Sequence, residues 1–191
     1  MQAYLRPSQY IDFEQADVLA CAHALANQAT SEQEIAQRCF EFVRDKIRHS
    51  VDFKQNPVTC KASDTLRYQT GYCYAKSHLL AALLRANAIP AGLCYQRLSV
   101  SDQGGAPYCL HGLNAIYLQG MGWYRVDARG NKPGINAQFS PPQEMLAFKL
   151  HDTEERDLPE IWAEPLPVVV AALTRHSHYE QVLAHLPDIT L

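Results

Sequence analysis

The first third of the chain carries apolar residues at the spacing of amphipathic helices. Residues 14–29 are predicted to form the first helix, whose apolar side comprises Ala16, Leu19, Ala20, His23 and Ala24. A second helix is predicted to begin at Ser31, because Ser31-x-x-Glu34 is a capping box in which each side chain satisfies a backbone donor of the first turn. Its apolar stripe runs to about Arg48, and we interpret this stripe as core packing.

Residues 49–70 lack a regular period, and Asn56-Pro57 indicates a turn within them. Residues 62–68 are predicted to form a short helix capped by Ser63 or Asp64. Gly71 then interrupts the pattern.

A third helix is predicted from Tyr72 until Asn87 and Pro90 end it. One whole side of this helix is apolar, formed by Ala75, Leu79, Leu80, Leu83 and Leu84. A helix with so broad an apolar face is expected to lie at the centre of the fold.

The period changes from helical to alternating after this helix. Residues 91–100, 108–118 and 123–128 are predicted strands, separated by turns rich in glycine. A loop is expected at 130–142, and two further helices are predicted near 167–174 and 177–186. Helices followed by an antiparallel sheet indicate the α+β class.

We expect a single domain over residues 1–191. Its core is expected at about residues 31–142. The N-terminal helix 14–29 precedes this core, and a C-terminal extension, the helical tail 143–191, follows it.

Composition and charge exclude several classes of protein. Hydrophobic residues make up 47% of the chain and charged residues 19%, which excludes a disordered protein. The net charge is −3 and the isoelectric point is near 6.2, so we expect neither a nucleic acid nor a membrane as a partner. The longest apolar runs hold six residues, whereas a membrane-spanning helix needs about 20.

The six cysteines are interpreted as free thiols. The first thirteen residues lack the apolar run of a signal peptide, so we expect a reducing, cytoplasmic compartment, although the even count is also compatible with disulfides. There is no C-x-x-C motif, and the acidic residues at 152–157 lack the spacing of an EF-hand. We therefore expect no metal site and no cofactor.

Three residues are candidates for chemistry because of their positions. Cys73 lies where a loop becomes a buried helix, and the free N–H groups and the dipole of a helix start favour a thiolate nucleophile. His111 and Asp127 lie 16 residues apart on consecutive strands, so a hairpin centred near Gln119 or Gly120 puts both on one face. Asp127 would then bind one imidazole nitrogen and leave the other facing the sulfur.

Each candidate also has a simpler interpretation. Cys73 is compatible with a small core residue, as most free cysteines are. His111 is compatible with a hydrogen-bonded histidine of the sheet, and Asp127 with a cap of the turn that follows it.

Three stretches of the chain resemble the transglutaminase-like superfamily of papain-fold cysteine enzymes. Residues 35–49 are similar to the helix that precedes the family's core. Residues 71–91, which contain Gly71-Tyr-Cys73, are similar to the nucleophile helix and its following turn. Residues 111–127 are similar to the hairpin between the family's histidine and aspartate, including the Gly-Trp before the last strand.

The resemblance implies a transglutaminase-like or papain-like cysteine-protease fold in a small bacterial-type member, with the nucleophile helix packed on an antiparallel sheet. It implies Cys73 as the nucleophile, His111 as general base and acid, and Asp127 as the residue that orients the histidine. Two positions depart from the family: Gly112 stands where alanine is frequent, and Leu113 where many members have an aromatic residue. Both positions would line a wall of the substrate cleft and do not affect the three candidate catalytic residues. The resemblance therefore does not identify the substrate.

Acyl transfer also requires donors for an oxyanion. The backbone N–H of Cys73 is the first candidate. Gln69 or Tyr68, just upstream, is a candidate for the second donor, and Tyr72 is a candidate for the substrate cleft. Gln69 is the residue type that papain-like sites use, but at a different spacing, and it is also compatible with a polar residue at a helix end.

The activity implied is transfer of an acyl group from an amide through a thioester, and we expect hydrolysis of a peptide or protein amide by a peptidase, amidase or deamidase. A transglutaminase-type transfer to an amine would use the same three residues. A binding protein that kept the fold without activity is the third alternative.

Only Lys76 and Arg67 offer positive charge near Cys73, so acetyl-coenzyme A is not expected as a donor. The sequence does not indicate an oligomeric state.

Overall fold

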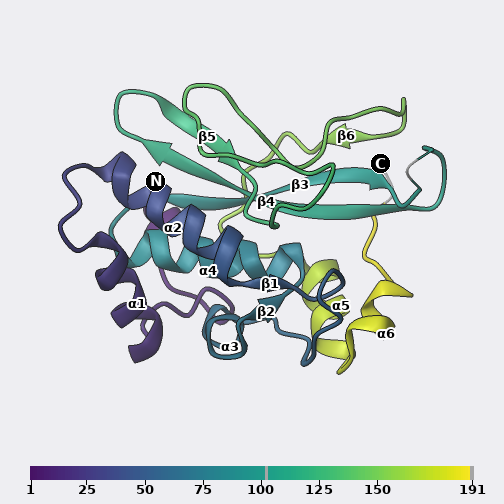
Figure 1. Ribbon diagram of the computed structural model, residues 1–191, viewed down its shortest axis with the longest axis horizontal. Coiled ribbons are helices and arrows are strands. Elements are labelled where there is room, and N and C mark those ends of the chain that lie inside the picture. The colour runs from purple at the N-terminus through teal and green to yellow at the C-terminus, as the bar shows by residue number, and fades with distance from the viewer. Residues whose placement is uncertain (102, 190–191) are drawn as a thin grey trace.

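A four-stranded antiparallel sheet lies on one side of the molecule, and helices cover its other side (Figure 1). The computed structural model describes residues 1–101 and 103–189. Its α+β class, with helices packed on an antiparallel sheet, agrees with the prediction from sequence. The helical elements are η1 (Gln2–Leu5), α1 (Ala16–Ala26), α2 (Glu32–Lys46), α3 (Ala62–Tyr68), α4 (Cys73–Ala86), α5 (Pro167–Arg175) and α6 (Tyr179–Leu183).

Two sheets are present in the described part of the chain. The larger has the order β5-β4-β3-β6, with β3 (Ala91–Ser99), β4 (Tyr108–Leu118), β5 (Gly122–Val126) and β6 (Arg156–Asp157). The smaller is a parallel pair of β1 (Arg48–His49) and β2 (Thr70–Gly71). Tyr117 pairs with Trp123 and Asn114 with Val126, so the β4–β5 hairpin has the predicted register.

Helix α4 occupies the centre of the fold, as its broad apolar face predicts. Every residue from Cys73 to Arg85 is buried. The helix packs against α1, α2 and α3 and also against strands β3 and β4 (Figure 1). Its N-terminal end, where Cys73 lies, is therefore fixed by both the helical layer and the sheet.

The predicted caps are only partly right. The hydroxyl of Ser31 accepts the Glu34 N–H at 3.2 Å, as predicted. The Glu34 carboxylate, however, accepts the N–H of Thr30 at 2.8 Å rather than that of Ser31, because the chain before α2 brings Thr30 closer. This arrangement still satisfies one extra backbone donor.

The predicted cap of α3 is wrong. The N-cap residue is Lys61, without a side-chain cap. Ser63 instead turns toward the N-terminal segment, where its N–H and hydroxyl donate to the Asp12 carboxylate at 3.0 and 2.5 Å. A distant carboxylate has therefore replaced the local cap.

The C-terminal extension is part of the same core. Its strand β6 pairs with β3, with Asp157 opposite Gln96. Apolar side chains of the extension join the main hydrophobic cluster, namely Leu158, Val169, Leu173 and Val182.

All six cysteines are free. Among residues 1–101 and 103–189, no helix has the length and apolarity needed to cross a membrane.

Candidate active site

The β1–β2 pair delivers Cys73 to the start of α4. Gly71 lies opposite His49 in this pair, and the Ser50 N–H donates to its carbonyl at 3.1 Å. A side chain at Gly71 would lie 3.0 Å from the Cβ of Ala75, so only glycine leaves the turn this tight. Helix α4 then begins at Cys73, which is 7% exposed.

Gly112 brings strand β4 against helix α4. Its N–H donates to Sγ of Cys73 at 3.4 Å. A Cβ at this position would lie 2.9 Å from Cδ1 and 3.2 Å from Cα of Tyr74. Glycine is therefore required for the close approach of β4 to α4, which gives a physical reason for this departure from the family pattern. The Tyr74 hydroxyl, which donates to the carbonyl of Leu110, also ties the two elements together.

His111 and Asp127 form a buried pair beside this contact. Nε2 of His111 lies 2.7 Å from Oδ2 of Asp127. The Asp127 carboxylate is fully buried and also accepts the N–H of Arg129 at 3.0 Å and that of Ala147 at 3.1 Å. With Nε2 engaged, Nδ1 is the imidazole nitrogen left for other partners.

The pKa values of His111 and Asp127 are shifted in opposite directions by their mutual attraction. Burial opposes a proton on His111, but the charges of Asp127 and of the Cys73 sulfur outweigh it and raise the pKa of His111 to about 10. Burial likewise raises the pKa of Asp127, but His111 and the two backbone donors outweigh it and hold this pKa below its usual value. The protonated imidazole is therefore stabilised by its pairing with the buried Asp127 carboxylate.

The C-terminal extension supplies two parts of the site that the sequence pattern did not predict. One is the Ala147 N–H on Asp127. The other is the Phe148 ring, which packs edge-on against the His111 ring at 4.9 Å between centroids. Neither carries a local signal, because a backbone donor has no sequence signature and a single aromatic residue in a loop is ordinary.

A second polar cluster lies next to the first. The Arg129 guanidinium donates to both oxygens of Asp52 at 2.6 and 3.2 Å, and Lys132 binds the same carboxylate at 2.7 Å. Burial raises the pKa of Asp52, but these cations outweigh it and lower the pKa to about 2. Nδ1 of His49 lies 3.8 Å from this carboxylate without a hydrogen-bond partner among the described residues. Burial and then the charge of Arg129 hold the pKa of His49 well below its usual value.

The predicted upstream oxyanion donors, Tyr68 and Gln69, are exposed side chains, and the hydrogen bond to the Cys73 sulfur comes from Gly112 instead. Tyr68 is 47% exposed, and Gln69 is an exposed residue that ends α3 in a left-handed conformation, with φ of 52°. The interpretation of Gln69 as a polar residue at a helix end is therefore the one the geometry favours. Tyr72 is buried beside Cys73, but its hydroxyl donates to the carbonyl of Tyr179 at 2.6 Å. It contributes a wall rather than a free donor.

No cluster of three or more histidine, cysteine, aspartate or glutamate side chains suited to a metal ion occurs in the described ranges, 1–101 and 103–189. The Gly112 N–H contacts the sulfur at the start of α4, and the adjacent His111 is close enough for the charge of the sulfur to raise its pKa. These groups suit nucleophilic chemistry by the thiol itself.

Comparison with known proteins assigns the fold to a family. The model of the transglutaminase-like superfamily matches residues 20–128, more than half of the chain. The chain belongs to the transglutaminase-like superfamily. The matched range runs from α1 to the end of the β4–β5 hairpin, so Cys73, His111 and Asp127 all lie inside it. No curated protein matches this superfamily member closely enough to be compared with it.

One solved structure supports this fold. It is a candidate cysteine protease from Cytophaga hutchinsonii, with 20% identity, a TM-score of 0.51, and coverage of 66% of this chain and 40% of that one. Another match is the periplasmic domain of TgpA from Pseudomonas aeruginosa, with 20% identity, a TM-score of 0.49, and coverage of 65% and 45%. This superfamily member therefore spans less than half the length of these two structures.

Proposed function

We propose that this protein is a cysteine-dependent enzyme that transfers an acyl group from a peptide or protein amide through a thioester on Cys73, with water as the main acceptor. The observation that carries the proposal is the continuous contact from the sulfur to β4 and on to Asp127. Gly112 donates to Sγ at 3.4 Å, and the adjacent His111 lies 2.7 Å from Asp127. Membership of the transglutaminase-like superfamily supports a cysteine-based enzyme in general.

The proposed reaction uses each group for one task. The Cys73 thiolate attacks the amide carbonyl, and the C–N bond breaks as His111 gives its proton to the leaving amine. Neutral His111 then takes a proton from water, whose oxygen attacks the thioester carbonyl and releases the acid and the thiolate. Asp127 holds the imidazole in place and stabilises its charged form in both steps.

Negative charge on the carbonyl oxygen is met by the start of α4. The first N–H groups of a helix have no partner within the helix, and the Cys73 N–H is the first of them. The helix dipole points its positive end toward the same place. This is the oxyanion donor that remains after Tyr68 and Gln69 are set aside.

The experiment is a screen of peptide amides with the wild-type protein and with Cys73→Ala as the blank. We expect release of an amine or ammonia by the wild type alone, and a covalent acyl adduct on Cys73 in rapidly quenched samples by mass spectrometry. Hydroxylamine added as a competing acceptor separates the two transfer reactions. Faster turnover with hydroxylamine than with water would favour the amine acyltransferase, whereas activity retained by Cys73→Ala would overturn the proposal.

The six free cysteines suit a reducing compartment. We therefore include a cytoplasmic location in the proposal. Mass spectrometry of thiols alkylated at the moment of cell lysis tests it, since oxidised cysteines in the fresh protein would contradict it.

A further inference from the structure

Exposed cations and exposed aromatic rings gather where the nucleophile helix begins. They lie at the end of α2, on β1 and its following loop, and at the end of α3. We call this surface the basic-aromatic patch, formed by Lys46, Arg48, Phe53, Lys54, Arg67 and Tyr68. All six are exposed.

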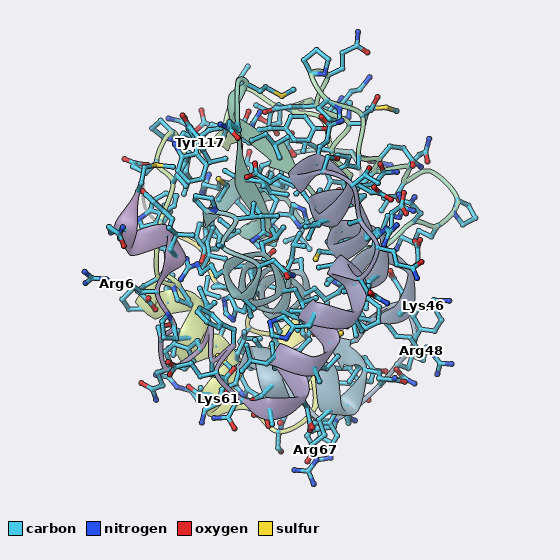
Figure 2. The ribbon with its side chains drawn as sticks, turned by 90° about the vertical axis from the view of Figure 1, so that its left-hand side faces the viewer. Arg6, Lys46, Arg48, Lys61, Arg67 and Tyr117 are labelled. Carbon is cyan, nitrogen blue, oxygen red and sulfur yellow. The ribbon has the colours of Figure 1, made fainter. Side chains whose placement is uncertain are left out.

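The patch is continuous. The Arg48 guanidinium lies over the Phe53 ring at 5.5 Å, and that of Arg67 over the Tyr68 ring at 5.6 Å. The two halves meet where the Arg48 N–H donates to the carbonyl of Gln69, the residue after Tyr68, at 2.9 Å. Figure 2 shows the side chains of Lys46 and Arg48 extending from the right-hand edge of the molecule and that of Arg67 from its lower edge, whereas Arg6 lies at the left-hand edge.

The positive charge of the patch is not compensated. Elsewhere on the surface, Arg38 binds Glu34 at 2.5 Å, and Arg97 binds Asp188 at 2.8 Å. In contrast, none of the four cations of the patch forms an ion pair with any residue that the structure describes.

Two of the carboxylates next to the patch are already occupied, while Asp17 and Asp64, which line one hollow with Arg67, form no ion pair with it. Asp45, beside Lys46, is held by Arg44 at 2.7 Å. Asp52, beside Phe53, is held by Arg129 and Lys132. A surface with four free cations on a chain of net charge −3 is therefore open to an external anion.

The aromatic residues give a second, independent indication. Phe53 is 58% exposed and Tyr68 is 47% exposed, and among the described residues no other aromatic side chain is as exposed. Exposed aromatic rings beside guanidinium groups are typical of surfaces that bind a partner. Phe53 is also tied to the site, because its N–H donates to the carbonyl of His49 at 3.1 Å.

We infer that the basic-aromatic patch binds an acidic stretch of the polypeptide whose amide is presented to Cys73. This inference rests on the proposed function, since it names the substrate class of the same site. The patch cations would pair with glutamate or aspartate side chains, and the rings would pack on the aliphatic parts of the same segment. A nucleic acid is disfavoured because the chain as a whole carries a net charge of −3, which repels a phosphate backbone.

The inference is tested by measuring peptide binding to a variant that lacks the Cys73 thiol. A short fluorescein-labelled peptide rich in glutamate is titrated into the Cys73→Ala protein, and a lysine-rich peptide of equal length serves as the matched ligand. We expect the acidic peptide to bind and the basic one not to bind. The double variant Arg48→Glu with Arg67→Glu should weaken binding about tenfold or more, whereas Arg6→Glu should not change it.

Raising the salt concentration from about 0.05 to 0.5 M should also weaken binding of the acidic peptide, because exposed charges are screened. Equal binding of both peptides, or no effect of the double variant, overturns the inference. Tighter binding of a single-stranded RNA oligonucleotide than of the acidic peptide overturns it in favour of a nucleic acid. Thermal melting of each variant confirms that it remains folded.

The experiments distinguish failure of the proposed function from failure of the patch inference. If the wild type acts on no amide but Cys73→Ala still binds the acidic peptide through the patch, only the proposed function is wrong. If the wild type cleaves small neutral amides while the peptide does not bind, only the patch inference is wrong.

Discussion

The backbone N–H of Ala147 donates to Oδ2 of Asp127 at 3.1 Å, the same oxygen that binds His111. A residue of the C-terminal extension is therefore part of the support for the histidine. Because buried charges need several donors to remain ionised, this contact helps to keep Asp127 in its charged form.

Replacing Ala147 by proline removes this donor and leaves the carboxylate with two partners. We expect kcat to fall about tenfold, from the loss of one hydrogen bond to a charged group. Ala147→Ser keeps the N–H and is the control, with kcat close to that of the wild type. If both variants have the same kcat, the contact does not support the site.

Replacing Asp127 by asparagine removes the charge that stabilises the imidazolium. We expect kcat to fall by a factor of about 10²–10⁴, with little change in KM. In the wild type, activity should be lost above pH 10, where His111 loses the proton that the leaving amine needs. In Asp127→Asn this loss should occur at lower pH, because the largest contribution that raises the pKa of His111 is gone.

A pH–rate profile of both proteins checks this prediction. Asp157→Asn changes a carboxylate of the same sheet that lies on β6, outside the site, and serves as the control. An alkaline limb at the same pH in the wild type and in Asp127→Asn would contradict the assigned pairing.

Cys73 should react with iodoacetamide before the other thiols at about pH 6.5, because it lies at the first position of α4 beside His111, whereas the other five thiols have raised pKa values. Burial raises the pKa of Cys39, Cys60, Cys94 and Cys109 to about 12, and it also raises that of Cys21. Peptide mapping by mass spectrometry measures each rate. His111→Gln should slow the labelling of Cys73 about tenfold or more, and uniform labelling of all six cysteines would count against the proposed nucleophile.

Gly112→Ala should separate β4 from α4, since the new methyl group would meet the backbone of Tyr74. We expect a loss of about 1–3 kcal/mol in the free energy of unfolding, as for an overpacked core. Labelling of Cys73 should also slow, because its contacts with β4 are stretched. Chemical denaturation and alkylation kinetics measure the two effects, and an unchanged labelling rate would show that the site does not depend on this approach.

His78 should make the fold sensitive to acid. It is fully buried, with Nδ1 2.7 Å from the carbonyl of Cys60, and burial lowers its pKa to about 4. The unfolded chain takes up this proton below about pH 6.5, whereas the folded chain does so only near pH 4. Stability is therefore fully present above pH 6.5 and declines as the pH falls toward 4, by up to about 3 kcal/mol.

Melting temperatures measured between these pH values check the prediction. His78→Gln has no such titration and should show a smaller decline over the same range, even if it is less stable throughout. An equal decline in both proteins would assign the effect to other groups, such as His49.

The sequence alone determined the elements and the relation between His111 and Asp127. Helical and alternating periods follow from local backbone geometry, so α1, α2, α4 and the strands β3, β4 and β5 appear where the pattern predicts them. The two-residue strands β1, β2 and β6 are too short to show a period and were not predicted. The even spacing of His111 and Asp127 around a short turn leaves them on one face of the sheet, because side chains of a strand alternate.

Only the tertiary structure decided what surrounds that pair. The contact of Gly112 with the Cys73 sulfur, the Ala147 donor and the Phe148 ring each join segments that are far apart in the chain or carry no pattern of their own. Such contacts depend on how packed layers meet and not on local periodicity, so spacing could not predict them. For the same reason, Gln69 was a plausible donor by type and position, yet the left-handed turn after α3 leaves it in solvent.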